Sequence, residues 1–379
     1  MATTAEYDEG DSMGKIVLFG ATGYTGELTA EALKKRGVEA TLAARSEEKL
    51  ADLKKRLDVD WPTAVADVND PASLEALLEP GDVLISTVGP FSRWGTVAAD
   101  AAVKKGAHYV DSTGEGAFIR DIFEKYGPQA EKAGITMMTA LGYDWAPGNL
   151  AGAVAVDRGG DDVSAVKIGY FNAGKPSKNS MSGGTMASSA GAMFYPAHSY
   201  LGGELVTERT AMRKHDFGEV EEGTPARGFS VGSSEAFSLP RVYPQLQDVD
   251  VYLGWNDPDK VQAQAAALEP VLADEATRAK MMADAEAKMP GSTGGPDADT
   301  RAQSRAVILA EGLDAAGDVK SQVRVEGVNG YDFTADFIAL AADKLQCGEV
   351  SKRGAIGPVE AFGVDKLTDY VAESGLTVD

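Results

Sequence analysis

Short apolar runs alternate with longer amphipathic segments over the first 140 positions of the chain. The apolar runs predict buried strands at Ile16–Phe19, Ala40–Ala44, Thr63–Ala66, Val83–Val88, His108–Val110 and Ile135–Thr139. The segments between them predict helices near Gly26–Lys35, Glu47–Arg56, Pro71–Leu78, Gly95–Lys105 and Phe118–Ala133. This alternation is typical of a parallel sheet covered by crossover helices.

Local signals support several of these helix boundaries. Asp70 is placed to cap a helix that has Pro71 at its first position, and Gly37 and Gly134 stand where helices should end. Six strands with five helices make a complete doubly wound, Rossmann-type dinucleotide-binding domain. We predict this domain at 14–145, after a flexible tail at 1–13.

Beyond residue 146 the pattern changes. Strands are predicted at Val163–Phe171, Val249–Gly254, Ser304–Glu311 and Val319–Glu326, and a hairpin turn at Asp314–Gly317 joins the last two. Helices are predicted at Thr185–Tyr195, Pro258–Leu268, Glu275–Lys288 and Tyr331–Leu345, and a surface loop at Pro290–Asp299. The fold class is therefore α/β, with a second α+β lobe at 146–349 that contains a largely antiparallel sheet. Residues 350–379 complete either the first lobe or the second, and the sequence pattern leaves both assignments open.

Three glycines follow the first predicted strand and open the first helix, in the series Gly20, Ala21, Thr22, Gly23, Tyr24, Thr25, Gly26. Glycine allows the backbone to approach a pyrophosphate closely, and a helix N-terminus offers free N–H groups with partial positive charge. We expect Gly20 and Thr22 to Gly26 to bind a dinucleotide. A tight turn without a ligand is the alternative.

The end of the second strand indicates which dinucleotide binds. The chain has Arg45 and Ser46 there, where an acidic residue would favour NAD, so we predict NADP with Arg45 on the 2′-phosphate and Ser46 beside it. Asp67 is placed near the adenine. The stretch from Thr87 through Val88, Gly89 and Pro90 closes the fourth strand, where the cofactor runs towards the nicotinamide.

Composition excludes several other functions. A formal net charge of −22 would repel nucleic acids and anionic lipid surfaces. The single cysteine, Cys347, excludes an intramolecular disulfide, and the three histidines lack metal-ligand spacing, so we predict no metal site. The sequence shows no apolar stretch long enough for a membrane span and no basic N-terminal leader. A cytoplasmic location is the expectation.

The motifs Val88–Gly95, Gly106–Glu115, Gly142–Gly148, Ser182–Thr185 and Gly357–Gly363 resemble those of the saccharopine dehydrogenase-like oxidoreductases. Within that family the chain is most similar to the branch that includes the trans-acting enoyl reductases. The resemblance implies an NADP-binding lobe, a second lobe that covers the nicotinamide, a homodimer, and reduction of a small-molecule substrate. Trp145 and Ala146 separate Asp144 from Pro147, unlike the compact turn of true saccharopine reductases, which disfavours an amino acid substrate.

We therefore expect an NADPH-dependent reductase of a C=C bond in an enoyl or conjugated, fairly apolar substrate, with acyl-carrier linkage as one form. An imine or opine-type reductase and a non-catalytic NADP-binding protein are the alternatives. Tyr143 is a candidate proton donor, or an aromatic packed at the domain junction. Ser182 and Thr185 open a helix of small residues, as an oxyanion site or a helix cap. His198 is a further candidate donor, and Glu115 orients a donor, binds ribose or caps a helix.

Overall fold

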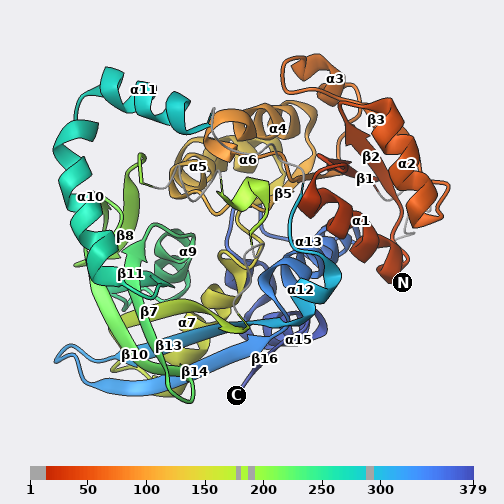
Figure 1. Cartoon of the computed structure of the whole chain (residues 1–379). Helices are drawn as coiled ribbons and strands as arrows, with labels where there is room; N and C mark the ends of the chain where they lie inside the picture. Colours follow the sequence, from red (N-terminus) through yellow and green to blue (C-terminus); the bar gives the residue numbers. More distant parts are fainter. Residues whose placement is uncertain (1–13, 176–180, 187–192, 287–293) are drawn as a thin grey trace, which may run out of the picture.

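The computed structural model describes residues 14–175, 181–186, 193–286 and 294–379 (Figure 1). The predicted tail at 1–13 lies outside this range. The N-terminal lobe contains a seven-stranded sheet in which every neighbouring pair is parallel. Its strand order is β15 (Gly354–Ala355), β6 (Thr136–Met138), β5 (His108–Asp111), β4 (Val83–Ser86), β1 (Ile16–Phe19), β2 (Ala40–Ala44), β3 (Thr63–Val65). The predicted parallel sheet is confirmed.

Alternation along β1 explains why helices cover both faces of this sheet. Ile16 and Leu18 belong to one apolar cluster, and Val17 and Phe19 belong to another on the opposite face. The helices of this lobe are α1 (Tyr24–Arg36), α2 (Glu47–Leu57), α3 (Pro71–Glu75), α4 (Phe91–Lys105), α5 (Gly116–Arg120), the π-helical η1 (Asp121–Tyr126) and α6 (Gly127–Ala133). The helix predicted at 118–133 is therefore three consecutive segments.

The second lobe is built on a nine-stranded sheet whose main path runs β10-β11-β12-β7-β13-β14-β16, with β8 and β9 paired beside β12. Only β12 and β7 pair in parallel; the other pairs are antiparallel, as predicted. The strands are β7 (Ala165–Gly174), β8 (Ala197–Leu201), β9 (Glu204–Glu208), β10 (Lys214–Glu221), β11 (Thr224–Val231), β12 (Asp248–Gly254), β13 (Ser304–Leu313), β14 (Val319–Gly327) and β16 (Leu376–Val378).

The helix α7 (Ala146–Gly159) is absent from the sequence-based prediction, and its burial explains why. All eleven positions from Ala146 to Val156 are buried, so the helix has no polar face and no amphipathic period. It packs against β7, β13 and β14 and forms the centre of the second lobe. The prediction also missed α9 (Glu235–Val242).

Two predicted features of the second lobe are wrong in part. The helix predicted at 185–195 does not reach Tyr195, because residues 193–196 are non-helical and β8 begins at Ala197; residues 187–192 lie outside the described range. The loop predicted at 290–299 ends early, since Asp297 caps α12 (Ala298–Ala302). The helices α10 (Pro258–Leu272) and α11 (Glu275–Glu286) match their predictions within the described residues.

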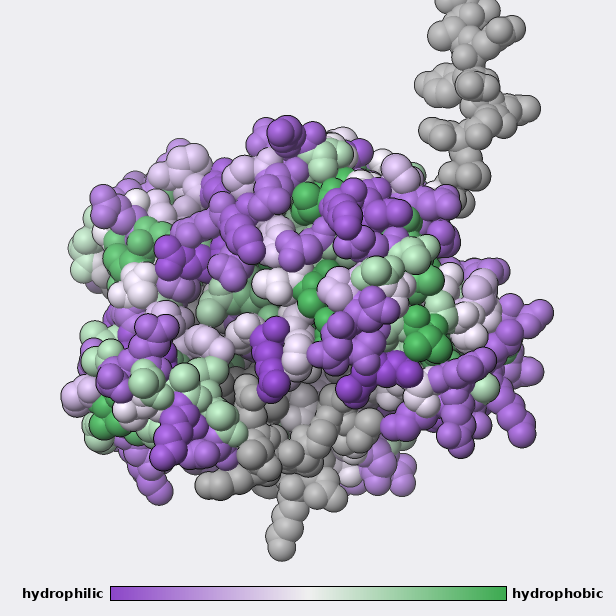
Figure 2. Space-filling model, turned by 90° about the horizontal axis from the view of Figure 1, so that it is seen from above, coloured by the Kyte–Doolittle hydropathy of each residue, from purple (hydrophilic) through white to green (hydrophobic). Residues whose placement is uncertain are grey.

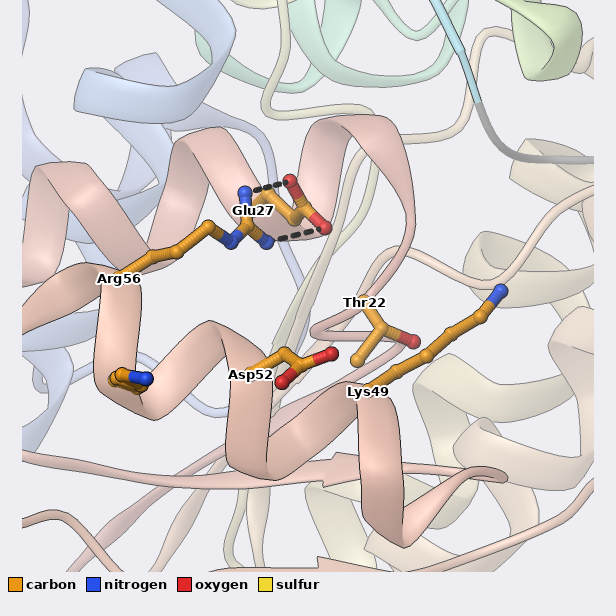
Figure 3. A pocket seen from close by; sticks show the side chains of 6 residues that line it. Thr22, Glu27, Lys49, Asp52 and Arg56 are labelled. Carbon is orange, nitrogen blue, oxygen red and sulfur yellow. Dashed lines mark hydrogen bonds and ion pairs between the residues drawn. The ribbon is translucent and has the colours of Figure 1, made fainter.

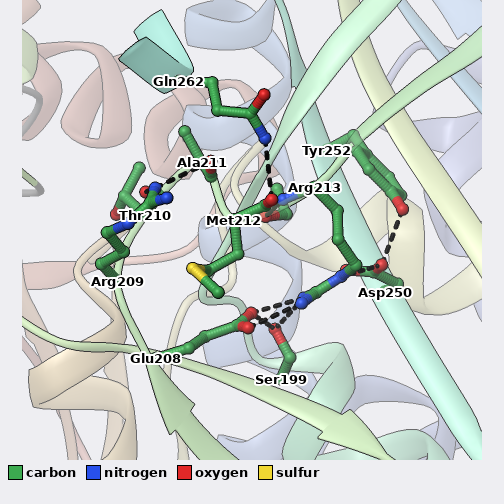
Figure 4. A network of polar contacts seen from close by, with 11 residues as sticks. Ser199, Glu208, Arg209, Thr210, Ala211, Met212, Arg213, Asp250, Tyr252 and Gln262 are labelled. Carbon is green, nitrogen blue, oxygen red and sulfur yellow. Dashed lines mark hydrogen bonds and ion pairs between the residues drawn. The ribbon is translucent and has the colours of Figure 1, made fainter. Parts of the chain in front are cut away.

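Arg213 joins the β8–β9 hairpin to the main sheet (Figure 4). Its guanidinium donates to Asp250 at 2.7 Å and to Glu208 at 2.6 Å, and it also reaches Ser199 at 3.2 Å. Burial alone would lower the pKa of Arg213, but the hydrogen bonds to both carboxylates raise it. One guanidinium thus lies between two acids inside the lobe and offsets part of their negative charge.

The C-terminal quarter of the chain connects both lobes. Helix α13 (Gly330–Gln346) packs beside α1 of the first lobe, as Figure 1 shows. Then β15 extends the parallel sheet, and after α14 (Pro358–Phe362) and α15 (Val364–Glu373) the final strand β16 pairs with β14 of the second sheet. Residues 350–379 thus contribute to both lobes. Figure 2 shows a mostly hydrophilic surface with small apolar patches, as the net charge leads one to expect.

Candidate functional site

The glycine-rich turn lies between β1 and α1, and two of its glycines are required by close backbone contacts. Gly20 has φ +91°, a conformation that side chains disfavour. A Cβ at Gly26 would lie 2.1 Å from the Gly20 carbonyl oxygen. The first helical bond of α1 runs from Glu27 N–H to the Gly23 oxygen at 2.8 Å, whereas the amides of Gly20 and Ala21 donate to the Ala43 oxygen and that of Gly23 donates to the Gly20 oxygen.

The end of β4 shapes this turn. The Thr87 hydroxyl donates to the backbone oxygens of Phe19 and Gly20, at 3.2 and 3.3 Å. A Cβ at Gly20 would meet Thr87 Oγ1 at 2.7 Å and Val88 Cγ2 at 2.8 Å. The side chains of Thr87 and Val88 therefore pack against the turn at Gly20. Gly89 and Pro90 connect them to the start of α4.

Glu115 follows β5 and caps α4. Its carboxylate accepts the backbone N–H groups of Phe91 and Ser92, at 2.8 and 2.9 Å, and also the Ser92 hydroxyl. Of the three roles that the sequence leaves open for Glu115, helix capping is the one that these contacts describe. The cap fixes the start of α4 at the sheet edge where the nicotinamide belongs.

Beyond the second strand, the side chains that face the adenosine end carry mixed charge. Arg45 is exposed at the end of β2, and Ser46 caps α2 by accepting Lys49 N–H at 3.3 Å. Next to them is a groove of about 630 Å³ between α1 and α2 (Figure 3). We call this the α1–α2 groove; it is lined by Thr22, Glu27, Lys49, Asp52, Lys55 and Arg56.

Lys49 is a candidate that sequence reasoning missed. It lies four residues after Arg45 on the first turn of α2 and, in Figure 3, extends past Thr22 of the glycine-rich turn. Arg56 is held by Glu27, with contacts of 2.9 and 3.1 Å. The i+4 spacing from Arg45 was the available signal. Asp67 is engaged locally, accepting both the backbone and side-chain amides of Asn69.

The segment Ser182–Thr185 lies against the first turn of α13. The Ser182 hydroxyl accepts Thr185 N–H at 3.1 Å, which is a helix-capping contact. The amide of Ser182 donates to the Tyr331 hydroxyl at 2.7 Å, and that of Gly183 to the Gly294 oxygen at 3.2 Å. Most backbone N–H groups of Ser182–Thr185 thus donate within the protein, so the groups of this segment that remain for a ligand are the hydroxyls of Ser182 and Thr185.

Tyr143 and His198 lie apart from each other. The Tyr143 hydroxyl donates to the Phe171 backbone oxygen at 2.8 Å, and burial raises its pKa well above the ordinary value. His198 is 2% exposed, and its ring contacts the Thr207 hydroxyl at 3.3 Å. Burial, followed by the charge of Arg120, lowers the pKa of His198. Neither contact pattern favours a proton donor.

A small cavity opens between the lobes at the carboxyl edge of the parallel sheet. Its volume is about 60 Å³, roughly the share of two water molecules in the liquid. We call it the interlobe cavity; it is lined by Gly114, Glu115, Gly116, Ala117, Trp145, Tyr195, Pro196, Ala197, Thr210, Val231, Gly232 and Leu253. None of these residues is an arginine or a lysine.

Behind the cavity wall lies a buried acid that sequence reasoning missed. Glu235 is fully buried, and its Oε1 lies 2.6 Å from the Tyr170 hydroxyl. The same hydroxyl accepts Gly148 N–H at 2.9 Å and lies 3.0 Å from the Trp145 carbonyl oxygen. One hydroxyl hydrogen cannot satisfy two acceptors, so a proton on Glu235 completes this arrangement.

The electrostatics agree with this proton count. Burial raises the pKa of Glu235 to about 8, and it raises the pKa of Asp144, on the same loop as Trp145, to about 6. The other oxygen of Glu235, Oε2, makes no hydrogen bond to a described residue. The cavity wall is therefore backed by an acid that is neutral at neutral pH.

Among the described residues, no group of three or more His, Cys, Asp or Glu side chains could hold a metal ion. Within the same residues, every helix is too short or too polar to span a membrane.

Comparison with known proteins identifies the first lobe. Residues 16–138 match the saccharopine dehydrogenase NADP binding domain. A trans-acting enoyl reductase of Mycobacterium tuberculosis is 41% identical over 140 residues, which is 36% of this chain and 34% of that relative. A trans-acting enoyl reductase of Mycobacterium ulcerans is 39% identical over 141 residues, with the same coverage. The matched region thus spans about a third of these relatives' length.

The whole fold also has a known counterpart. Apo saccharopine dehydrogenase (L-Glu forming) from Saccharomyces cerevisiae superposes with a TM-score of 0.61, over 97% of this chain and 99% of the yeast chain. Sequence identity is 14%, so the likeness concerns the fold. The resemblance inferred from the sequence motifs is confirmed, as are the fold class and the cofactor.

Proposed function

We propose that this chain, an NADP-dependent oxidoreductase whose N-terminal lobe is a saccharopine dehydrogenase NADP binding domain, reduces the C=C bond of an enoyl or similarly conjugated substrate of low polarity. The observation that carries the proposal is the lining of the interlobe cavity, which has no lysine or arginine among the residues that the structure describes. An amino acid or opine substrate presents an α-carboxylate, which proteins usually bind through an arginine.

For the cofactor we assign roles along the carboxyl edge of the sheet. The turn from Gly20 to Gly26 binds the pyrophosphate through its remaining backbone amides, and the close approach of Gly26 to the Gly20 oxygen supports this role. Arg45, Ser46, Thr22 and Lys49 lie where the 2′-phosphate belongs, with the guanidinium and ammonium groups neutralising its charge.

Bound NADPH supplies a hydride at its nicotinamide ring. The chain positions the acceptor and keeps water out: Trp145 and Val231 form buried walls of the interlobe cavity, and the Glu115 cap fixes the adjoining start of α4. Glu235, which holds its proton, adds no charge behind this wall. The described lining has the carboxylate of Glu115 but no arginine or lysine to pair with an anion, so it disfavours a substrate that carries a carboxylate.

The test follows NADPH oxidation with two kinds of acceptor. Crotonyl N-acetylcysteamine thioester and cyclohexenone represent conjugated C=C bonds; pyruvate with an added primary amine represents the imine route. We expect turnover with the first kind. Oxidation of NADPH only with the keto acid and amine would overturn the proposal, and tight NADPH binding without turnover of any acceptor would favour a non-catalytic role.

Two finer expectations accompany this function. We propose that the chain acts as a cytoplasmic homodimer and that its natural substrate is carried as an acyl thioester. Light scattering of the purified protein would test the first part, because a monomer mass at micromolar concentration contradicts it. Comparing a free thioester with the same acyl group on a carrier protein would test the second.

A further inference from the structure

Three hydroxyl groups from separate parts of the second lobe form a chain. Ser182 Oγ lies 3.0 Å from Thr185 Oγ1, and Thr185 Oγ1 lies 2.9 Å from the Tyr331 hydroxyl. Backbone amides fix both ends, because Thr185 N–H donates to Ser182 Oγ and Ser182 N–H donates to Tyr331. We call Ser182, Thr185 and Tyr331 the hydroxyl triad.

Counting hydrogens shows that the triad has a donor to spare. Three hydroxyl groups carry three hydrogens, and the two contacts between them use two. Both amide contacts place hydrogens onto hydroxyl oxygens, so they leave this count unchanged. Ser182 is 4% exposed, whereas Thr185 and Tyr331 are partly exposed. The remaining hydrogen is therefore available to a ligand from Tyr331 or Thr185.

The triad lies next to the cofactor-binding turn. The ring of Tyr331 meets that of Tyr24, the first residue of α1, edge to face with centroids 5.2 Å apart. The Tyr24 hydroxyl donates to the Pro296 oxygen at 2.5 Å, and Arg301 binds Asp332 at 2.7 Å. These contacts fix the start of α13 beside the start of α1. The Tyr143 N–H also donates to Thr334 Oγ1 at 2.8 Å, so the same end of α13 lies against the loop whose Trp145 lines the interlobe cavity.

We infer that the hydroxyl triad donates a hydrogen bond to the carbonyl oxygen of the substrate, with Tyr331 as the residue that completes the site. The inference rests on the proposed function and deepens it. When a hydride bonds to the β-carbon of an enoyl group, the π electrons shift towards the carbonyl and its oxygen becomes negative. A proton from solvent then bonds to the α-carbon. A donor aimed at that oxygen stabilises the charge as it forms.

The first experiment does not need turnover. Acetoacetyl N-acetylcysteamine thioester forms an enolate that absorbs in the ultraviolet, and an oxyanion donor favours that form. We expect the NADP⁺-bound protein to raise enolate absorbance at constant pH. Tyr331→Phe keeps the ring contact with Tyr24 but removes the oxygen, so it should abolish the signal. Tyr370→Phe is the matched control. Tyr370 is on α15 and its hydroxyl donates to Glu349, so this variant should leave the signal intact.

The second experiment measures NADPH oxidation with the crotonyl thioester. Tyr331→Phe should lower kcat about 100-fold, while the Kd for NADPH stays within about twofold. Thr185→Val removes the central hydroxyl without altering the tyrosine pair and should lower kcat about tenfold. Thr185→Ser restores a hydroxyl and should restore most of the rate. These Thr185 variants keep the inference testable if Tyr331→Phe fails to fold.

The outcomes separate the inference from the proposed function. An enolate signal that depends on Tyr331, in a protein that reduces no enoyl substrate, would support the triad and overturn the proposed function. Turnover with no effect of either hydroxyl deletion would overturn the triad alone. A higher Kd for NADPH with unchanged kcat at saturation would place the donor on a cofactor oxygen, which also contradicts the inference.

Discussion

The α1–α2 groove and the interlobe cavity lie at opposite ends of the same sheet edge and differ in charge. The groove is lined by Lys49, Lys55 and Arg56 together with two acids, whereas no lysine or arginine is among the cavity's lining residues. In a chain of net charge −22, basic side chains at one end of the edge suit an anionic cofactor. The other end has no such cation in its described lining, and its one acid, Glu115, accepts the backbone amides of Phe91 and Ser92.

The same contrast holds for buried acids. Glu208 and Asp250 in the second lobe share the guanidinium of Arg213 as their hydrogen-bond donor (Figure 4). Glu235 has the Tyr170 hydroxyl as its close partner instead, and it stays protonated. Burial of an unpaired carboxylate is costly, and a raised pKa is the usual response. The buried acid behind the cavity is therefore stabilised by its own proton, whereas the two acids of the network are stabilised by the guanidinium of Arg213.

The largest expected effect concerns the backbone that holds the cofactor. Gly26→Ala would place a Cβ 2.1 Å from the Gly20 oxygen and force the turn away from α1. We expect the Kd for NADPH, measured by nucleotide fluorescence, to rise at least about 100-fold, equivalent to about 3 kcal/mol. Gly37→Ala at the other end of the same helix is the control, because no atom lies within 4 Å of its Cβ.

The control matters because both changes cost stability. Gly37 has φ +71°, so alanine there weakens the end of α1 by roughly 1 kcal/mol without touching the turn. Equal loss of NADPH affinity in both variants would mean that helix stability, and not the shape of the turn, governs binding.

The next effect tests the charge at the adenosine end. Arg45→Ala and Lys49→Ala each remove one charge-assisted contact of the proposed 2′-phosphate site, which is worth about 1.5–3 kcal/mol. We expect the Kd for NADPH to rise about 10- to 100-fold, with that for NADH changed little. The control is Lys104→Ala. Lys104 is on α4 and pairs with Glu75 on α3, away from the groove between α1 and α2. Parallel loss of NADH binding would refute a 2′-phosphate role.

Comparison of the two lobes shows what the sequence can and cannot predict. In the first lobe, each predicted strand is present because buried parallel strands give short apolar runs separated by amphipathic helices. In the second lobe, α7 was not predicted because a helix that is buried on all sides has no amphipathic period. The strands β8 to β11 were not predicted because exposed and buried positions are mixed along them. Pattern alone fails where burial is uniform or alternation is weak.

The site shows the same limit. The glycine-rich turn and Arg45 were predicted from local sequence, since strand, turn and helix are contiguous there. Tyr331 and Glu235 were not, because their roles come from contacts between segments far apart in sequence: Tyr331 meets Ser182 and Tyr24, and Glu235 meets Tyr170. Nothing local to either residue distinguishes it from a packed tyrosine or a surface glutamate.

The smallest expected effect on turnover concerns the proton on Glu235. Its pKa in the folded state, about 8, lies above the ordinary value of 4.5, so the folded protein binds this proton more tightly than the unfolded chain does. The free energy of unfolding should therefore fall as the pH rises from about 4.5 through 8. Glu235→Gln, which cannot ionise, should flatten this decline and keep kcat above pH 8, where the wild type loses a few-fold.

Urea unfolding between pH 3 and 9, together with turnover at pH 6, 7.5 and 9, would measure both effects and would include the acidic range in which Glu311 loses its contribution. Glu311→Gln provides a control of opposite sign. The hydrogen bond and charge of His215 outweigh burial and lower the pKa of Glu311, so its stabilising contribution is lost as the pH falls. If Glu235→Gln declined with rising pH as steeply as the wild type, Glu235 would be ionised in the folded protein. The cavity would then carry a buried negative charge at its wall, and the contrast with the Arg213 network would disappear.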